Sequence, residues 1–371
     1  MNKEKRKQVS VYLKAGERAA TSYYRFYQYF KNLDADVKYN LMIPDNRWND
    51  FFPIARQPKW KQVYIFFYIY LRVLGNLLSD AIKKTDCLII SRCIINKIVP
   101  LSFKIILKII KRNGCKIIWD IDDNIIGTEM TRANFDWFSD FVDIIIVGSP
   151  ILKELVCEQN RNKVLVLPTT DGDMHYLISD EIKNERLKTF EKIVKFIWVG
   201  TFSSLPYVER ITEAFEEASL TFKKQGKELQ LIVVCDKKLR YIPKNFSLFN
   251  LKWEKHVSIE QMLHAHVGIM PLENNENNRG KCGFKLIQYL SAGLPIIGST
   301  VGINQMIIKE GCGIGVEELN ITKWTNAIKE IAIDAESWKQ LSLNAYKDWE
   351  NHYNHNAILS EWKDLILTIA S

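Results

Sequence analysis

The chain has 371 residues, of which 47% are hydrophobic and 25% charged, with a formal net charge of +8. These values indicate a soluble globular protein with room for two domains of ordinary size. The 7 cysteines form no C-x-x-C pair and have no regular spacing, which argues against a disulfide framework and a zinc site and fits a reducing cytoplasm.

The N-terminal residues "MNKEKRKQVSVYLKAG" are basic but lack the apolar centre of a signal peptide. The most apolar stretch, residues 63–78, is interrupted by Arg72. It is also shorter than the roughly 20 apolar residues that span a bilayer, so we do not expect it to cross one.

Positive charge is concentrated in the first half of the chain. Residues 1–168 hold 27 Lys and Arg against 17 Asp and Glu, whereas residues 169–371 hold 24 against 26. The first half therefore has a net charge of +10 and the second of −2. This asymmetry predicts an anionic partner for the first half, either nucleic acid or an anionic membrane surface.

Short apolar runs alternate with amphipathic stretches along the whole chain, which is typical of βαβ units on a parallel sheet. Helices are predicted at 18–33 and 101–113. The predicted strands lie at residues 8–13, 86–91, 115–122, 143–149, 163–168, 195–200, 229–236, 267–272, 294–299 and 313–316.

The pattern stops after residue 168 and restarts at 195, which predicts two α/β domains. We expect a first domain at 1–168, a hinge at 169–194, a second domain at 195–345 and a C-terminal helix at 346–371 that returns to the first domain. Ligands of open parallel sheets bind beyond the carboxyl ends of the strands, and two facing sheets form a cleft there. The loops after the strands are therefore the candidate site.

The loop after the first strand, "KAGERAATSYYRF", contains a glycine and two arginines. Gly16 lets the backbone border the cleft, and Arg18 or Arg25 is placed to meet a phosphate or an acceptor. The alternative for Arg25 is a surface arginine on an aromatic helix.

A second candidate, "IIWDIDDN", puts three carboxylates at the end of a strand. Such a group binds Mg²⁺ or accepts a proton. The start of a haloacid-dehalogenase-like phosphatase is disfavoured, because Asn124 stands where that pattern needs Thr or Val. Asp122 or Asp123 facing the acceptor is the functional interpretation, and Asp120 has a structural alternative.

Two segments of the first half are both basic and apolar, which fits an anionic membrane surface as the partner. Residues 59–84 join an aromatic band to flanking lysines, and residues 103–114 place Lys104, Lys108 and Lys111 on one helical face. Both patterns occur in helices that lie in a membrane interface. The other interpretation is a buried helix with a solvated basic edge, which we favour for 103–114 but not for 59–84.

In the second half, "VGTFSSLPYV" is the first loop between a strand and a helix. Gly200 permits close approach, and Thr201, Ser203 and Ser204 offer hydroxyl and N–H groups to a phosphate. An ordinary serine N-cap explains the same pattern.

The stretch "NRGKCGFKLIQYLSAGLPIIGS" places Lys281 and Lys285 beside Gly280 and Gly283 where a loop becomes a helix near Gly283. A cation at a helix N-terminus is unfavourable unless an anion is near. The stretch therefore predicts a phosphate or diphosphate site, against the alternative of a glycine turn with solvated lysines.

The block "GKCGFKLIQYLSAGLPIIGSTVGIN" resembles the donor-binding motif of GT-B glycosyltransferases related to glycosyltransferase family 4. "GERAATSYYRFYQYF", "IIWDIDDNI" and "FIWVGTFSS" resemble other landmarks of a bacterial branch of this group, in matching order. The resemblance implies the GT-B fold, and Arg25 matches an arginine that recurs in this branch. Together the residue pattern and the resemblance give the candidate binding residues Gly16, Arg25, Gly200, Thr201, Ser203, Gly280, Gly283, Phe284 and Gln288, with the donor expected on the second domain and the acceptor on the first.

The sequence departs from the family at its two glutamates, E-x7-E. Gly280 occupies the first position and Gln288 the second. In the family the second glutamate holds the ribose hydroxyls, which an amide also does by hydrogen bonding. The first contacts the donor sugar, and no residue here is assigned that role.

These observations predict a glycosyltransferase that takes a sugar from a nucleotide-diphosphate donor and builds a bacterial surface polysaccharide. Lys281 and Lys285 would stabilise the leaving diphosphate, and Asp122 would serve the acceptor side. The resemblance alone implies retention of anomeric configuration and no metal or other cofactor. The expected partners are the donor, a glycan or lipid-linked acceptor and an anionic membrane, at the cytoplasmic side of the plasma membrane.

Two other classes stay open. A UDP-sugar epimerase of the same fold needs acid and base groups, and the loop at 272–288 offers only Glu273 and Glu276. A catalytically inactive binding subunit is compatible with the missing glutamates, although both lysines are present. Nucleic-acid binding is disfavoured because no recognition motif accompanies the basic segments.

Overall fold

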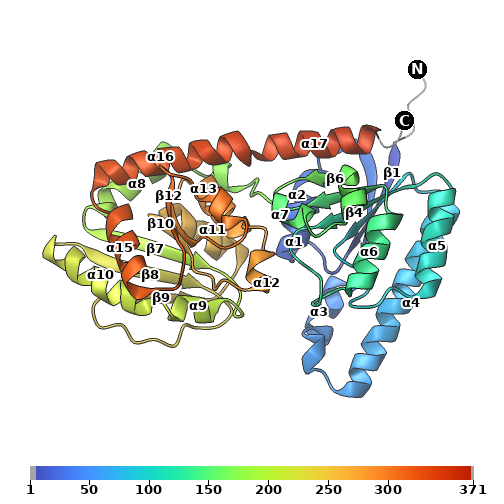
Figure 1. Ribbon diagram of the computed structural model, residues 1–371, viewed down its shortest axis with the longest axis horizontal. Coiled ribbons are helices and arrows are strands. Elements are labelled where there is room, and N and C mark those ends of the chain that lie inside the picture. Colours follow the sequence, from blue (N-terminus) through green and yellow to red (C-terminus); the bar gives the residue numbers. More distant parts are fainter. Residues whose placement is uncertain (1–5, 369–371) are drawn as a thin grey trace. The chain divides into compact units, whose positions relative to one another are not determined.

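The computed structural model describes residues 6–368. By its internal contacts the chain divides into two units, residues 1–168 together with 356–371, and residues 169–355. Each unit contains a six-stranded parallel sheet with helices on both faces (Figure 1). The predicted α/β fold class is confirmed.

The sheet of the first unit has the strand order β2-β1-β3-β4-β5-β6, so the chain starts near one edge and ends at the other. All of its strand pairs are parallel. The strands are β1 (Lys7–Leu13), β2 (Ala35–Leu41), β3 (Cys87–Ser91), β4 (Lys116–Ile121), β5 (Ile144–Val147) and β6 (Val164–Val166).

Longer helices of the first unit include α4, α5, α6 and α17; the others are short. The segment after β1 passes through a π-helical turn at Tyr23–Tyr27. The helices are α1 (Ala20–Ser22), α2 (Gln28–Phe30), α3 (Trp48–Phe51), α4 (Lys59–Lys83), α5 (Leu101–Arg112), α6 (Arg132–Phe141), α7 (Pro150–Lys153) and α17 (His355–Thr368), with 3-10 turns at Asp45–Arg47, Ile54–Arg56 and Glu158–Lys163.

The strands of the first unit bury both faces, because successive side chains point to opposite sides. In β4, Trp119 packs with α4, α5 and α6 on one face. Its neighbour Ile118 packs on the other face with the segment after β1 and with α17, where Trp362 lies against Phe26 and Phe30. The C-terminal helix is therefore part of the first unit.

Helix α4 has one buried and one exposed side. Ile65, Val73 and Leu77 belong to the core, and Asp80 on the same side accepts hydrogen bonds from Ser10 Oγ at 2.7 Å and Tyr12 Oη at 2.5 Å. Within residues 6–368, α4 is the one helix whose length and apolar composition suffice to cross a membrane. The buried side shows that α4 is also a packing helix of this sheet.

The second unit has the strand order β12-β11-β10-β7-β8-β9, again with parallel pairs. Its strands are β7 (Ile193–Val199), β8 (Glu228–Val234), β9 (Ser247–Leu251), β10 (Val267–Met270), β11 (Ile296–Ser299) and β12 (Gly313–Val316). Its helices are α8 (Asp180–Phe190), α9 (Leu205–Glu209), α10 (Thr212–Lys224), α11 (Lys255–His264), α12 (Glu276–Arg279), α13 (Phe284–Ser291), α14 (Asn304–Ile307), α15 (Ile321–Ile331) and α16 (Ala335–His352), with a 3-10 turn at Met174–Tyr176.

Two contacts hold the C-terminal end of helix α13. Tyr289 Oη accepts a hydrogen bond from Val199 N, the last residue of β7, at 2.9 Å. The buried guanidinium of Arg186 donates to the carbonyl of Ala292 at 2.8 Å, just beyond the helix, and to Leu263 and Met262 in the last turn of α11. These contacts fix the direction in which the N-terminus of α13 points.

Candidate functional site

The central strands of the second sheet bring three loops to one edge. Because β10, β7 and β8 are adjacent and parallel, their carboxyl ends lie side by side. The loops that leave them are residues 200–204, 235–246 and 271–275 with the segment up to α13. This edge of the sheet is where open α/β folds bind ligands.

The segment between β10 and α13 is stabilised by its asparagines and a glycine. Asn275 caps α12 by accepting from Asn278 N at 3.0 Å, and Asn278 Nδ2 donates to the carbonyl of Glu273 at 2.9 Å. Gly283 is the N-cap of α13 with φ of 70°, a left-handed conformation that favours glycine. The helix therefore begins at Phe284, where the sequence predicts it.

Both predicted lysines lie at the start of α13. Lys281 Nζ donates to Ser204 Oγ of the β7 loop at 3.1 Å. Lys285 Nζ donates to Gln288 Oε1 at 3.0 Å and lies 5.1 Å from the centre of the Phe284 ring. Burial lowers the pKa of Lys285 to about 8, and the nearby Asp171 opposes this shift. A partly buried ammonium beside the positive end of a helix is arranged for an anionic ligand.

Gln288 is buried and joins Lys285 to a second buried group. Its Nε2 donates to Asp171 Oδ2 at 2.7 Å. Sequence reasoning missed Asp171, because it is separated from Gln288 by 117 residues and lies in the segment expected to be a hinge. The structure places residues 169–194 in the second unit.

The loop that follows β7, residues 200–204 (the β7 loop), contacts Lys281 through Ser204. Gly200 is required by packing, because a Cβ there would come within 2.4 Å of the Trp198 ring. The hydroxyls of Thr201 and Ser203 are exposed and 2.8 Å apart. Ser204 is the N-cap residue of the short α9 but makes no side-chain capping bond, so its hydroxyl serves Lys281 instead.

A basic residue that the sequence reasoning passed over lies in the β8 loop. Lys237 Nζ is 4.8 Å from the centre of the exposed ring of Phe202 in the β7 loop. Adjacent strand ends place it on the same edge as Thr201. Both strands were predicted from the sequence. Had they been taken as neighbours in the sheet, Lys237 would have been expected beside the β7 loop.

In the first unit, Gly16 and Arg25 have packing roles. A Cβ on Gly16 would come within 2.4 Å of the Asp45 carboxylate. The Arg25 side chain is 2% exposed, forms an ion pair with Asp120 and donates to the Leu167 carbonyl at 2.6 Å. The structure thus gives Arg25 a buried partner rather than the surface or phosphate-facing position that the sequence suggested.

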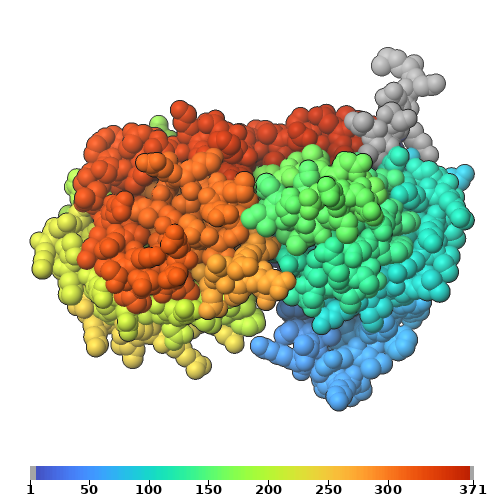
Figure 2. All heavy atoms as spheres, viewed as in Figure 1, coloured from blue at the N-terminus to red at the C-terminus, as the bar shows by residue number. Residues whose placement is uncertain are grey.

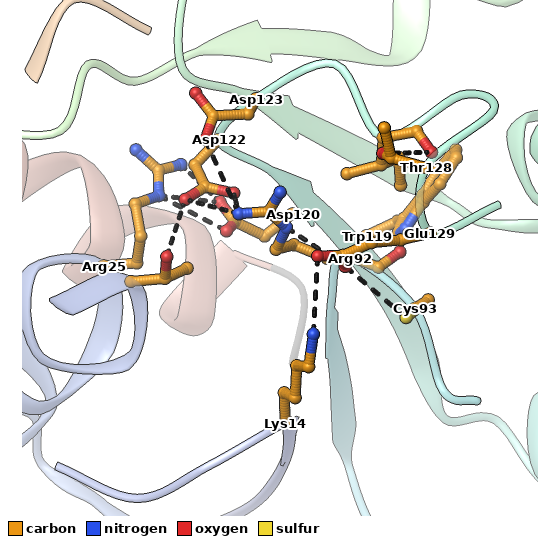
Figure 3. Close-up of polar contacts among 12 residues, drawn as sticks. Lys14, Arg25, Arg92, Cys93, Trp119, Asp120, Asp122, Asp123, Thr128 and Glu129 are labelled. Carbon is orange, nitrogen blue, oxygen red and sulfur yellow. Dashed lines mark hydrogen bonds and ion pairs between the residues drawn. The ribbon is translucent and has the colours of Figure 1, made fainter. Parts of the chain in front are cut away.

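Asp122 lies in a cluster of charged side chains at the carboxyl ends of β1, β3 and β4 (Figure 3). Arg92 Nη1 lies 3.2 Å from Asp122 Oδ1, and Arg92 Nε lies 3.3 Å from Glu129 Oε2. Thr21 Oγ1 donates to Asp122 Oδ2 at 3.0 Å. Lys14 Nζ lies 3.6 Å from Glu129, which closes the cluster on the β1 side.

Arg92 holds this cluster from an unusual backbone position. Its φ is 60°, although it is not a glycine, and its N–H donates to the Asp120 carbonyl at 2.8 Å. Its carbonyl accepts from Trp119 Nε1 at 2.8 Å. Non-glycine residues in this region cost free energy and are frequent at functional sites. Among residues 6–368, no group of three or more His, Cys, Asp or Glu side chains is arranged to hold a metal ion.

Nearly the whole chain is similar in fold to solved structures of GT-B enzymes. HepE from Anabaena in complex with UDP and glucose matches with a TM-score of 0.63 and 10% identity, over 98% of this chain and 100% of that one. Sucrose-phosphate synthase from Thermosynechococcus elongatus matches with 0.63 and 14%, over 99% and 100%. UDP-GlcNAc 2-epimerase from Neisseria meningitidis bound to UDP-GlcNAc matches with 0.55 and 9%, over 97% and 99%. These likenesses define the GT-B fold.

Residues 194–334, which contain all of β7 except its first residue, β8 to β12, and both Lys281 and Lys285, match the family described as glycosyl transferases group 1. No curated protein matches the sequence. With this domain and the GT-B fold, the chain is a glycosyltransferase, and the resemblance noted in the sequence is confirmed.

Proposed function

We propose that the chain transfers a sugar from a nucleotide-diphosphate donor that binds at the N-terminus of α13. The observation that carries this proposal is the pair Lys281 and Lys285, both held by hydrogen bonds beside that N-terminus in the group 1 domain. The structures of HepE in complex with UDP and glucose, and with UDP-glucose, support a nucleotide-sugar donor of this kind.

In this mechanism the residues of the second unit bind the departing diphosphate. Cleavage at the anomeric carbon adds negative charge to the leaving phosphate, and preorganised donors at that position lower the barrier. Lys281 and Lys285 supply two cations, and the first turn of α13 supplies N–H groups that lack intrahelical acceptors. Thr201 and Ser203 extend this surface with hydroxyl groups.

Asp122 is our proposed acceptor-side residue, and Arg92 with Thr21 keeps its carboxylate in one orientation. We propose retention of anomeric configuration and catalysis without a metal, as the resemblance implies. Asp122→Asn is then expected to lower kcat while leaving nucleotide affinity unchanged, and activity is expected to survive EDTA. An Asp122→Asn enzyme with full kcat would remove Asp122 from the mechanism.

Calorimetric titration with UDP, GDP, CMP and ADP tests the donor site. One nucleotide is expected to bind tightly, and Lys281→Ala and Lys285→Ala to weaken it by about 10- to 100-fold each, as for charged hydrogen bonds to phosphate. Lys347→Ala, on α16, is the matched control. Absence of binding by all four nucleotides would refute the donor site.

The epimerase alternative rests on the likeness to UDP-GlcNAc 2-epimerase. Of the carboxylates in the loop after β10, Glu273 forms a 2.9 Å ion pair with Arg210, which weakens its case as an acid or base. Incubation with a nucleotide sugar, with and without a glycan acceptor, separates the two functions. Conversion of the donor to an epimer without acceptor would favour the epimerase.

We further propose that the acceptor is a lipid-linked glycan for a surface polysaccharide, presented at the cytoplasmic leaflet, and that α4 and α5 face the membrane. Half of the exposed large hydrophobic side chains in the described chain lie within residues 60–82 and 98–109. On α4 they form a stripe opposite the buried side: Trp60, Val63, Tyr64, Phe67, Leu71, Leu78 and Ile82.

Charge favours an anionic lipid surface as the partner. Segments 59–84 and 97–112 contain ten Lys and Arg, and their one acidic residue, Asp80, is buried. The segment from α3 into α4 projects from the body of the first unit (Figures 1 and 2). Apolar side chains framed by lysines insert into an anionic interface.

Sedimentation with vesicles tests this surface. The chain is expected to bind phosphatidylglycerol-containing vesicles, to bind neutral phosphatidylcholine vesicles weakly, and to lose binding in Trp60→Ser/Phe67→Ser/Leu71→Ser. Ile242→Ser/Leu343→Ser, at exposed positions of the second unit, is the control. Equal binding by the triple variant and the parent would refute the assignment.

A further inference from the structure

The amide at position 288 has a buried carboxylate as its neighbour. Gln288 is 1% exposed and Asp171 is 0% exposed, and Gln288 Nε2 lies 2.7 Å from Asp171 Oδ2. The family pattern has a glutamate at position 288. The structure therefore shows a specific environment for the residue in which this chain departs from its relatives.

Asp171 is fixed by the backbone that follows it. Its Oδ1 accepts hydrogen bonds from Asp173 N at 2.9 Å and Met174 N at 3.1 Å, at the start of the 3-10 turn Met174–Tyr176. These two bonds leave Oδ2 directed at Gln288. The carboxylate cannot rotate away without leaving backbone N–H groups unpaired.

This anchor determines how the Gln288 amide is oriented. An ionised carboxylate only accepts hydrogen bonds, so the amide must turn its NH₂ group to Asp171. Its oxygen then faces the other way and accepts from Lys285 Nζ at 3.0 Å. Asp171 thus acts on Lys285 through an intervening amide.

We propose that Asp171 is a positioning residue for the donor site: through the Gln288 amide it holds the Lys285 ammonium at the N-terminus of α13, and its buried carboxylate requires an amide at position 288. The inference rests on the proposed function, in which Lys285 binds the donor diphosphate. It also explains the departure from the family pattern, because a glutamate at 288 would place two carboxylates in contact.

The exchange of the two side-chain types tests this proposal. In Asp171→Asn/Gln288→Glu, the new asparagine NH₂ donates to the new glutamate, whose other oxygen accepts from Lys285. The hydrogen bonds and the total charge are thereby kept. Each single change breaks the pattern: Gln288→Glu opposes two carboxylates, and Asp171→Asn lets the Gln288 amide turn its NH₂ group towards Lys285.

Nucleotide titration at pH 8 is expected to show at least about tenfold weaker binding for each single variant and a double variant within about threefold of the parent, as coupled charged neighbours require. Gln288→Glu is expected to regain affinity near pH 5.5, where the carboxyl pair holds a proton. A merely structural role would not produce this pH dependence. Single variants with parental affinity, or a double variant no better than the worse single variant, would overturn the proposal.

Thermal unfolding of the same four proteins without nucleotide provides a second measurement. A restored melting temperature in the double variant supports the pairing of residues 171 and 288, and equal melting temperatures in all four proteins would refute it. If the parent protein binds no nucleotide, the proposed function fails. The melting temperatures of the four proteins still show in that case whether residues 171 and 288 interact. Restored unfolding without restored binding would overturn the positioning role alone.

Discussion

Raising the pH from 7 to 9.5 is expected to weaken nucleotide binding about 30-fold, because Lys285 loses its proton. Burial lowers the pKa of Lys285 to about 8 in the nucleotide-free protein. A bound diphosphate favours the ammonium and raises this pKa towards the ordinary value of about 10.4. Affinity is therefore constant below pH 8 and falls about tenfold per pH unit between the two pKa values.

The size of the effect follows from the same pKa. The difference between about 10.4 and about 8 corresponds to roughly 3 kcal/mol, an upper limit because the side chain keeps some contact with water. Calorimetry between pH 7 and 9.5 measures it, a range in which the nucleotide is fully charged because the second phosphate pKa is about 6. Calorimetry in two buffers of different ionisation enthalpy is expected to show that the protein takes up about half a proton for each nucleotide bound at pH 8.

Lys285→Arg is the matched control, because a guanidinium stays charged throughout this range. Its nucleotide affinity is expected to be independent of pH, whatever its absolute value. A parent protein whose affinity is unchanged from pH 7 to 9.5 would show that Lys285 does not supply the charge that binds the nucleotide.

The other predictions concern stability. Lys285→Met is expected to raise the melting temperature of the nucleotide-free protein, because it removes a partly desolvated charge, and to weaken nucleotide binding by about 10- to 100-fold in the same titration. Asp120→Asn is expected to lower the free energy of unfolding, measured with denaturant, by about 3–5 kcal/mol, because it leaves the buried Arg25 without its counter-charge. Asp36→Asn, at an exposed position, is the control. A decrease below about 1 kcal/mol in Asp120→Asn would contradict the prediction. Arg186→Met is expected to destabilise the second unit.

The strands that sequence reasoning found and missed differ in their burial. Central strands such as β4 and β8 carry long apolar runs because both faces are covered, and these were predicted. The two strands that were missed, β2 and β9, lie at sheet edges and are largely half-exposed. Their mixed polar sequences do not stand out from the surrounding loops.

The site residues that the sequence predicted are marked by residues close by in the sequence, whereas the residues whose roles were missed have their partners far away. Gly283, Lys281 and Lys285 were predicted because a helix start, a glycine and its cations are neighbours in sequence. The roles of Asp171 and Arg25 were not, since their partners Gln288 and Asp120 are 117 and 95 residues away. Buried polar pairs of this kind have no periodicity that a single sequence reveals.

Arg186 connects the stability of the second unit to its site. Its guanidinium donates to the carbonyls of Leu263, Met262 and Ala292, so one cation covers the negative ends of both α11 and α13. Burial lowers its pKa to about 10, which shows that desolvation opposes this arrangement. When Arg186 is replaced by an apolar residue, three buried carbonyl groups lose their hydrogen-bond donor. We expect the free energy lost with these hydrogen bonds to exceed the free energy gained by removing the desolvated charge.

Arg186→Met keeps most of the side-chain volume and is expected to lower the free energy of unfolding by about 2–4 kcal/mol, the range for buried acceptors left unpaired. Denaturant unfolding followed by circular dichroism measures it, with the exposed Arg240→Met within about 0.5 kcal/mol as control. An unchanged Arg186→Met midpoint would show that the buried charge costs as much as its three hydrogen bonds contribute. In that case Tyr289 and the β7 contact, rather than Arg186, would hold α13 against the sheet.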